Sequence, residues 1–463
     1  MIRRPLLLCT LTSLALAACS SSGTSDPGGN PSNETALAKS NLQRAPAAEV
    51  PSEALSGASA ANNAFAVDLY TQVLTAPTAS THNVLTSPLS ASLALTMAFS
   101  GAHGQTATEM AAALHIDPNA RDAAFAGQNA LSQGLNARAA AAFARATQNA
   151  KSGGAAPSAD DYQLQVVNSV WGEKSYTWEA PFLDILATNY GTGVYQTDFI
   201  HAYEPARLSI NAWVSDHTND KINDLLAKGV LDDATRMVLV NALHLKMPWE
   251  TPFEASLTRP DTFTLADAST VSADFMRLTT NLGYADDGDA QVVTLPLANR
   301  ELSVVIALPH DGVSLSSYEA KLGAKSGVLA PPPQTQLVAL SLPKVNFTSA
   351  SFSLAEPLKA LGMNQAFDRA QADFHGLCAQ PPDGANLYVS DVVQKAMIAM
   401  EESGVEAAAA TAVVVAGTTS IEVDPPSPVS VVVNRPFMIS IVDQPTGAVL
   451  MLGHVQNPTE TAQ

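Results

Sequence analysis

The spacing of hydrophobic residues along this chain alternates between the period of a helix and the period of a strand. In Ala64–Leu74 the apolar residues recur at every third or fourth position, which predicts an amphipathic helix. Leu164–Gly172 alternates apolar and polar residues, which predicts a strand with one buried face. The same patterns predict further helices and strands at Pro88–Met97, Phe182–Tyr190, Ala206–His217, Val292–Pro296, Leu302–Pro309 and Leu354–Leu361. The chain is therefore predicted to be an α+β protein.

The stretch Glu401–Ser420 has an unusual composition. Four alanines follow Glu406, and Val413–Val415 comes shortly after them. The alanines alone would favour a helix, but Gly404 before them and the prolines after the stretch disfavour one. In a strand, Val405 and every second residue after it would share one face, and Glu406 would lie on the other. A segment of such small side chains can form an exposed loop and can also slide between two strands.

The N-terminal residues predict an export signal. Residues 1–18 contain two arginines, an apolar run and small residues before Cys19, and the apolar run is too short to span a bilayer as a mature helix. Leu16–Cys19 resembles the lipobox of bacterial lipoproteins, in which Cys19 becomes the lipidated first residue. The alternative is an ordinary signal peptide that happens to contain a cysteine. Residues 19–60, rich in Ser, Gly, Pro and Ala, predict a flexible tether before a single domain at 61–463.

Charge and cysteine content limit the kinds of partner and cross-link that this protein can have. The chain has 24 Lys and Arg against 43 Asp and Glu, a net charge of −19. Such a surface repels nucleic acid and anionic lipid, so we expect no nucleic acid partner and a membrane link only through the acyl anchor on Cys19. Ser20 after the cysteine favours the outer membrane or cell surface, with release from the cell as the alternative. With Cys9 removed and Cys19 lipidated, Cys378 remains alone, so no intramolecular disulfide can form.

The nine histidines do not follow a catalytic or metal-binding spacing. The sequence contains no His-Glu-x-x-His, no Cys-x-x-Cys, no phosphate-binding glycine loop and no Gly-x-Ser-x-Gly turn. A triad assembled from distant residues stays open, although no pattern favours one. Residues 119–161 carry few positive charges, so a polyanionic, heparin-like cofactor is not expected either. We expect no enzyme, no cofactor and no metal site.

Five ordered motifs resemble those of the serpins, a family of protease inhibitors. Glu402–Thr411 resembles the hinge of the reactive loop in inhibitory serpins, and Val389–Ala396 resembles the strand that leads into that loop. Asn241–Phe253 is similar to the family's Asn-Ala-x-x-Phe-Lys-Gly-x-Trp-x-x-x-Phe block, with Met in place of Gly. Asn434–Phe437 and Gly453–Pro458 resemble the C-terminal signature. The resemblance extends over the predicted domain.

The resemblance implies the serpin fold, with three β-sheets, about eight or nine helices and an exposed reactive loop at about 402–433. We expect a monomer. The resemblance assigns the hinge of the loop to Glu402, Gly404, Val405, Glu406, Ala407, Ala408, Ala409, Ala410 and Thr411. It places four residues in the region where the main sheet opens, namely Ser87, Asn211, Trp249 and Gln394.

Three residues in or near the hinge bear on whether the loop can insert into the main sheet. Gly404 is expected to allow a reversal of the backbone. Val405 stands where Thr or Ser is usual, but an apolar residue can be buried, so insertion should survive. Gln394 stands where a His commonly helps to latch the sheet; it can still donate and accept hydrogen bonds. Any pH dependence that such a histidine would bring should be absent.

The function implied by the resemblance is suicide inhibition of a serine protease, or of a cysteine protease. The protease would attack the loop and form an acyl-enzyme, and the hinge would then insert into the main sheet as a new strand. The family's spacing from Glu402 places the scissile bond at Thr418–Thr419, with cleavage after Val415 or Ile421 as alternatives. Residues of this size favour an elastase-like or subtilisin-like target.

Two other functions stay open from the sequence. The first is a non-inhibitory, surface-anchored binding or structural lipoprotein that keeps the serpin fold. The second is a hydrolase, for which the sequence gives no positive reason.

Overall fold

The computed structural model describes residues 35–151, 156–323, 326–382, 384, 386–406 and 427–461. Thr35–Gln463 forms one compact unit. The predicted signal peptide and Cys19 lie outside the described residues. Within the described part of the chain, no helix is both long enough and apolar enough to cross a membrane.

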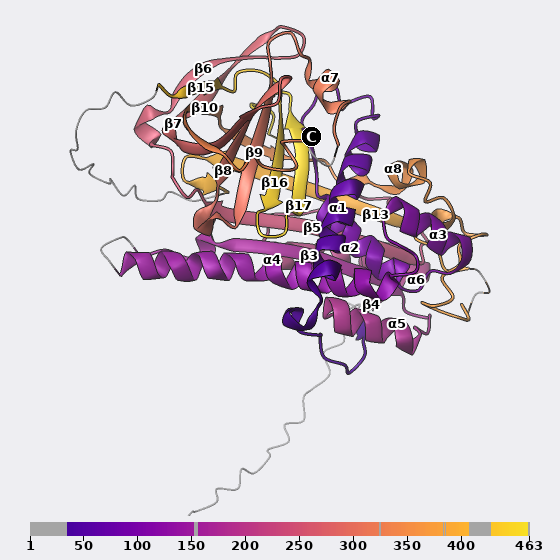
Figure 1. The fold of residues 1–463 in the computed structure, drawn as a ribbon. Helices are drawn as coiled ribbons and strands as arrows, with labels where there is room; N and C mark the ends of the chain where they lie inside the picture. The colour runs from indigo at the N-terminus through magenta and orange to yellow at the C-terminus, as the bar shows by residue number, and fades with distance from the viewer. Residues whose placement is uncertain are drawn as a thin grey trace, which may run out of the picture. The chain divides into compact units, whose positions relative to one another are not determined.

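An eight-stranded sheet contains the strand that leads to the predicted hinge. Its strands lie in the order β1-β4-β3-β5-β14-β13-β11, and β12 pairs with β13. Of these strands, β3, β4, β5 and β13 are labelled in Figure 1. Their bounds are β1 (Ala36–Ala38), β3 (Gln163–Glu173), β4 (Val194–Thr197), β5 (Met237–Pro248), β11 (Val345–Thr348), β12 (Phe352–Ser353), β13 (Asp391–Glu401) and β14 (Gly404–Val405).

The centre of this sheet contains a parallel seam. The segment of β5 at 238–243 pairs in parallel with Asp391–Ala396 of β13. Beyond Ala396 the short strand β14 lies between these two strands and is antiparallel to both. Val405 of β14 is opposite Met247 on β5 and Met400 on β13. The two strands therefore separate at the end where the predicted hinge begins.

A nine-stranded sheet forms the second layer, in the order β15-β10-β7-β8-β9-β16-β17-β2, with β6 paired to β7. The three-sheet expectation is not met among the described residues, because the long strand β7 connects β6, β10 and β15 to the rest of this sheet. The bounds are β2 (Val84–Thr86), β6 (Arg259–Thr264), β7 (Thr270–Asp286), β8 (Ala290–Pro296), β9 (Leu302–Pro309), β10 (Thr335–Pro343), β15 (Val429–Val432), β16 (Phe437–Asp443) and β17 (Val449–Val455).

Eight α-helices are present in the described residues, in agreement with the predicted α+β class and helix count. They are α1 (Ser52–Val73), α2 (Pro88–Phe99), α3 (Gly104–Ala113), α4 (Arg121–Ala150), α5 (Ala180–Ile185), α6 (Phe199–His217), α7 (Leu315–Glu319) and α8 (Ala355–Ala360). Short 3-10 turns lie at Ala47–Glu49, Ala159–Asp161, Ala255–Leu257, Ala298–Arg300 and Gln365–Phe367, and a π-helical turn at Leu186–Tyr190.

The helices cover both faces of the eight-stranded sheet. Helix α2 has Pro88 as its first residue, is buried along its whole length and contacts both sheets through β3, β5 and β17. Helix α4 runs along β3 (Figure 1). Helix α6 covers the opposite face, where Ile210 and Val214 pack with Val238 and Val240 of β5. The seam therefore lies between α2 on one face and α6 on the other.

Residues 35–60 are part of the folded unit, so the predicted flexible tether is wrong for this stretch. Strand β1 pairs with β4, and α1 already begins at Ser52. Arg44 Nε donates to Asn129 Oδ1 at 2.8 Å, and Arg44 Nη2 donates to Ser132 Oγ at 2.5 Å. The polar composition suggested disorder, but the sheet edge and the polar side of α4 supply hydrogen-bond partners for these residues.

Candidate functional site

A buried amide network holds the seam from the side of α2. The Ser87 N–H donates to Gln394 Oε1 at 3.0 Å, and Gln394 Nε2 donates to the Ser87 carbonyl oxygen at 2.8 Å and to Asn241 Oδ1 at 2.8 Å. Asn241 Nδ2 in turn donates to the Val393 carbonyl oxygen at 3.2 Å. Ser87, Gln394 and Asn241 are all buried. The network therefore joins the start of α2 to β5 and β13, where these strands are still paired.

Trp249 lies at the other end of the opening, beside the turn between β13 and β14. Its indole Nε1 donates to the Glu401 carbonyl oxygen at 2.8 Å, and its backbone N–H donates to the Ser403 carbonyl oxygen at 3.0 Å. The carboxylate of Glu402, in the same turn, pairs with Lys344 Nζ at 2.8 Å. These contacts fix the chain at the point where it enters β14.

Asn211 lies apart from both of these groups. Its Nδ2 donates to the Leu226 carbonyl oxygen at 3.0 Å, and its Oδ1 accepts from the Leu226 N–H at 2.8 Å. Both bonds anchor α6 to the segment that follows it. The four residues predicted for the sheet-opening region therefore do not form one cluster: Ser87 and Gln394 contact each other, whereas Asn211 and Trp249 hold other segments.

The hinge begins inside the sheet. Gly404 and Val405 form β14, and Val405 is 2% exposed. Gly404 follows the turn that reverses the chain from β13 into the antiparallel β14. It does not have a positive φ, and a Cβ there would collide with the backbone of Met247 and Pro248 on β5. The positive φ belongs instead to Glu406, at 48°. The other hinge residues, Ala407–Ala410 and Thr411, and the predicted bond Thr418–Thr419 lie outside the described residues.

Glu406 has partners that the sequence did not reveal. Its Oε1 lies 2.5 Å from Lys221 Nζ, and its Oε2 lies 2.5 Å from His244 Nε2. Burial raises the pKa of the Glu406 carboxyl, but the hydrogen bonds and charges of His244 and Lys221 outweigh it, so the pKa is lowered on balance. The sequence placed Glu406 on a strand face but gave no signal for partners more than 160 positions away.

A second buried polar cluster joins α1, α7 and β17. Glu319 Oε1 accepts from Tyr70 Oη at 2.6 Å and lies 2.6 Å from His454 Nδ1. Tyr70 and His454 are at most 2% exposed, so the histidine is closed off from a substrate. Burial and the Glu319 charge raise the pKa of Tyr70. The cluster has a structural role in joining these elements.

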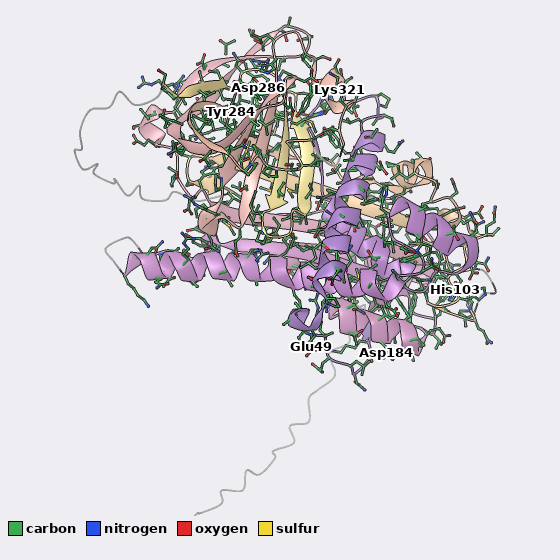
Figure 2. The ribbon with its side chains drawn as sticks, in the orientation of Figure 1. Glu49, His103, Asp184, Tyr284, Asp286 and Lys321 are labelled. Carbon is green, nitrogen blue, oxygen red and sulfur yellow. The ribbon has the colours of Figure 1, made fainter. Side chains whose placement is uncertain are left out.

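The other histidines are spread over the molecule. His103, just before α3, and Asp286, the β7 residue that binds His310 at 2.9 Å, lie far apart (Figure 2). In the described ranges, no group of three His, Cys, Asp or Glu side chains could hold a metal ion. Cys378 is buried.

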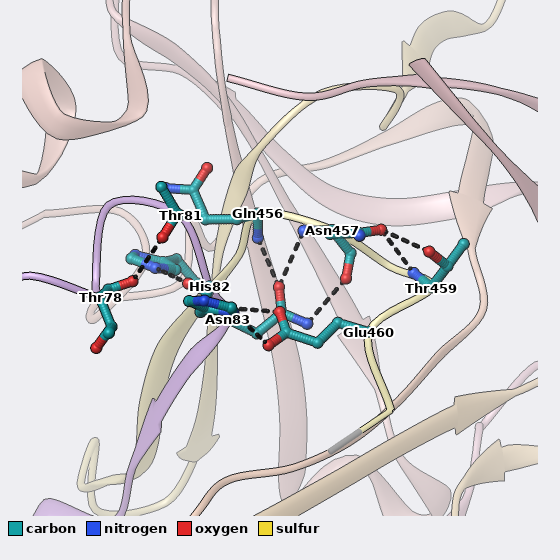
Figure 3. Close-up of polar contacts among 9 residues, drawn as sticks. Thr78, Thr81, His82, Asn83, Gln456, Asn457, Thr459 and Glu460 are labelled. Carbon is teal, nitrogen blue, oxygen red and sulfur yellow. Dashed lines mark hydrogen bonds and ion pairs between the residues drawn. The ribbon is translucent and has the colours of Figure 1, made fainter. Parts of the chain in front are cut away.

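The C-terminal motif ties the end of the chain to the start of β2 (Figure 3). The Gln456 and Asn457 N–H groups both donate to Asn83 Oδ1, at 2.8 and 3.0 Å. Glu460 accepts from the Asn83 N–H at 2.9 Å and pairs with His82 at 2.9 Å. These bonds give the C-terminal signature a structural role.

A cavity of about 690 Å³ lies away from the hinge. It is lined by the end of α1, the end of β6 and α7, including Leu74, Leu265, Leu315 and Gln456. Gln456 Oε1 is buried and has no hydrogen-bond partner in the described residues. None of the site residues predicted from the sequence lines this cavity.

Comparison with known proteins identifies the fold and the family. A model of the family described as "Serpin (serine protease inhibitor)" matches residues 60–458. The leukocyte elastase inhibitor of Bos taurus is 33% identical over 409 residues, covering 86% of this chain and 99% of that protein. The serpin-like protein TK1782 of Thermococcus kodakarensis is 32% identical over 399 residues, covering 86% of this chain and 85% of that protein.

Solved serpin structures resemble the fold of this chain. The thermophilic serpin tengpin in its native state superposes with a TM-score of 0.73 at 26% identity, over 91% of this chain and 99% of that one. Human thyroxine-binding globulin with its hormone gives a TM-score of 0.73 at 28% identity, over 88% and 100%. The chain therefore belongs to the serpins, a family of serine protease inhibitors rather than enzymes.

Proposed function

We propose that this protein inhibits a serine protease as a suicide substrate. The protease attacks the reactive loop and forms an acyl-enzyme, and the freed loop then enters the seam between β5 and β13. The inserted strand carries the bound protease with it and distorts the protease active site, so deacylation stalls. A cysteine protease, which also forms an acyl-enzyme, is the alternative target.

The observation that carries this proposal is the position of β14. Gly404 and Val405 already lie between β5 and β13, so a strand extended from them has a defined place to go. A dozen new ladder hydrogen bonds at roughly 0.5 to 1.5 kcal/mol each would release on the order of 10 kcal/mol. That energy is sufficient to deform an active site, and it must be stored in a metastable native state.

The target is inferred from the residues around the predicted bond. Thr418 and Thr419 are small and β-branched, and no Lys or Arg lies between Lys395 and Arg435. This favours an elastase-like or subtilisin-like protease over a trypsin-like one. Similarity to several leukocyte elastase inhibitors supports the same class. Cleavage after Val415 or Ile421 is the alternative.

The N-terminal sequence supports an exported, lipid-anchored protein. Cys19 would carry the lipid, and the protein would reside at the outer membrane or cell surface or be released from the cell. The compact unit that the anchor would hold begins at Thr35. Cys19→Ser should abolish acylation, detected as loss of metabolic labelling by palmitate; equal labelling of the variant would contradict the anchor.

The inhibitory function can be tested with the compact unit 35–463. It is incubated with an elastase and with a subtilisin and analysed by denaturing gel and intact mass. We expect a covalent complex and a released peptide that begins at Thr419. Complete cleavage with fully active protease would refute inhibition.

A matched pair of variants tests the insertion step. Val405 is buried in β14, whereas Val230, which lies outside the predicted loop, is 39% exposed. Val405→Arg should be cleaved without trapping the protease, since a charge cannot be buried at that position at low cost. Val230→Arg should form the complex as the native protein does.

A second candidate function is ligand binding without inhibition. It is favoured by the 690 Å³ cavity and by the similarity to a serpin whose structure contains thyroxine. Cleavage without a trapped complex, together with a ligand that raises the unfolding temperature, would favour it.

A further inference from the structure

Glu406 directly follows the last residue of β14 in the eight-stranded sheet. Its backbone N–H still donates to the Ala399 carbonyl oxygen of β13, at 2.6 Å. Its φ of 48° lies in the left-handed region, which is unfavourable for a residue with a side chain. Strand pairing beyond Val405 would require this backbone to become extended. The present conformation of Glu406 is therefore incompatible with continuing the β14 ladder through this residue.

The carboxylate is held from two other elements. His244 comes from β5, and Lys221 comes from the segment that follows α6. Each carboxylate oxygen has its own partner at 2.5 Å. The side chains of Glu406 and His244 are 9% and 3% exposed, so water screens their contact weakly.

These partners lie along the path of a longer inserted strand. Val405 is opposite Met247, so the next residues to pair with β5 would run along Lys246, Leu245 and His244. His244 therefore lies on β5 between the last parallel pair of the seam and the pairs that β5 makes with β14.

The contacts also lie on the α6 face of the sheet. Alternate residues of β5 from Val238 to Ala242 pack with α6, and His244 continues this alternation. Lys221 reaches Glu406 from the segment that follows α6, and Lys395 of β13 donates to the Asn223 carbonyl oxygen of the same segment at 2.7 Å. This covering segment is thus attached both to the hinge and to the seam.

We propose that Glu406, His244 and Lys221 form a lock that stops the hinge after Val405 and sets the rate of further insertion. The proposal rests on the proposed function, because insertion is the step that the lock controls. The three side chains are positioning residues: they hold the loop and do not contact the protease. Release requires the two contacts to break while the Glu406 backbone rearranges.

The first test does not depend on inhibition. Hydrogen–deuterium exchange of the peptide covering Glu401–Glu406 is measured in the full chain, in Glu406→Gln and in the control Glu401→Gln. Glu401 is an exposed neighbour, so its variant removes the same charge without touching the lock. We expect exchange on the order of tenfold faster in Glu406→Gln only. Equal exchange in all three proteins would overturn the lock.

The second test follows insertion after cleavage. Trp249 reports on this region, because its indole is bonded to the Glu401 carbonyl oxygen. After protease is added, the fluorescence should change several-fold faster in Glu406→Gln than in the native protein. In Glu401→Gln it should change at the native rate. An equal or slower change in Glu406→Gln would overturn the lock. If no change occurs even in the native protein, the proposed function fails, while the exchange experiment still decides on the lock.

Lys221 provides a variant with little risk to folding. Its side chain is 44% exposed, so Lys221→Met should fold normally. It should accelerate exchange in the same direction as Glu406→Gln by a smaller factor, and the double variant should show less than the product of the two effects. Lys221→Arg should restore slow exchange. Independent, multiplicative effects would show that the two side chains do not act together.

Discussion

The α-carbon of Gly404 faces the carbonyl oxygen of Met247 across the β14–β5 ladder, with no space between them for a methyl group. Glycine is therefore required at this position by close approach of two backbones, and not by an unusual φ.

Gly404→Ala should expel the tip of the hinge from the sheet. The added methyl group would meet backbone atoms, which cannot move aside as a flexible side chain could. We expect faster amide exchange at Val405 and a larger fraction of cleaved inhibitor for each complex formed. Gly57→Ala in α1 is the control, since nothing lies within 4 Å of its added methyl group; a similar effect of both substitutions would contradict this explanation.

Gln394→Ala should destabilise the native state. It leaves the Ser87 N–H and Asn241 Oδ1 without their partner in a buried place, whereas the Ser87 carbonyl oxygen keeps the Ala91 N–H as a donor. Each orphaned group costs about 1–3 kcal/mol, although rearrangement and entering water will reduce the total. The measurement is the midpoint and rate of urea unfolding. Gln371→Ala, at an exposed position, should leave both unchanged.

The hinge should respond to acid through Glu406. The pKa of this carboxyl is lowered in the folded protein, because the hydrogen bonds and charges of His244 and Lys221 outweigh the opposing effect of burial. Such a group contributes stability above its unfolded pKa, about 4.3 for Glu, and the contribution is lost as the pH falls through the folded value. Amide exchange of Val405, corrected for its intrinsic pH dependence, should rise as the pH falls below about 4. In Glu406→Gln this rise in exchange should be absent. If the rise persists in that variant, another titrating group causes the acid response.

Arg44→Ala should lower stability although residue 44 lies in the stretch expected to be a tether. The substitution removes the donor to Ser132 Oγ and one of the two donors to Asn129 Oδ1, which keeps Gln133 Nε2. We expect a loss of about 1–3 kcal/mol in the free energy of unfolding. Arg145→Ala, at an exposed position near the end of the same helix, is the control. Equal stability of the native protein and Arg44→Ala would mean that this segment only rests on the surface.

Local sequence patterns predicted those helices and strands whose hydrophobic pattern lies within the element itself. Alternation identified β3, a proline-bounded apolar run identified β9, and helical spacing identified α1. The resemblance also pointed to Gln394 and Trp249 near the opening, and the structure places both beside the strands that separate. What these predictions share is a pattern within a single element or motif.

Features that depend on distant partners could not be predicted in this way. Strand β1 is only three residues long and is ordered by the edge of β4, about 160 positions later. The contact between Glu406 and His244 joins two strands separated by 162 residues. Composition alone favoured a linker around β1 and an exposed loop around Glu406, because neither distant partner is visible in the local sequence.

The parallel pairing of β5 with β13 affects the energy of inserting a further strand between them. A strand that enters from β14 replaces a parallel rung with two antiparallel rungs, one on each side, and antiparallel ladders are slightly more stable per residue. Six parallel register pairs remain below the opening. In the proposed insertion, each residue that enters would therefore gain more pairing than it breaks, so the seam itself would favour the direction from β14 toward Asp391.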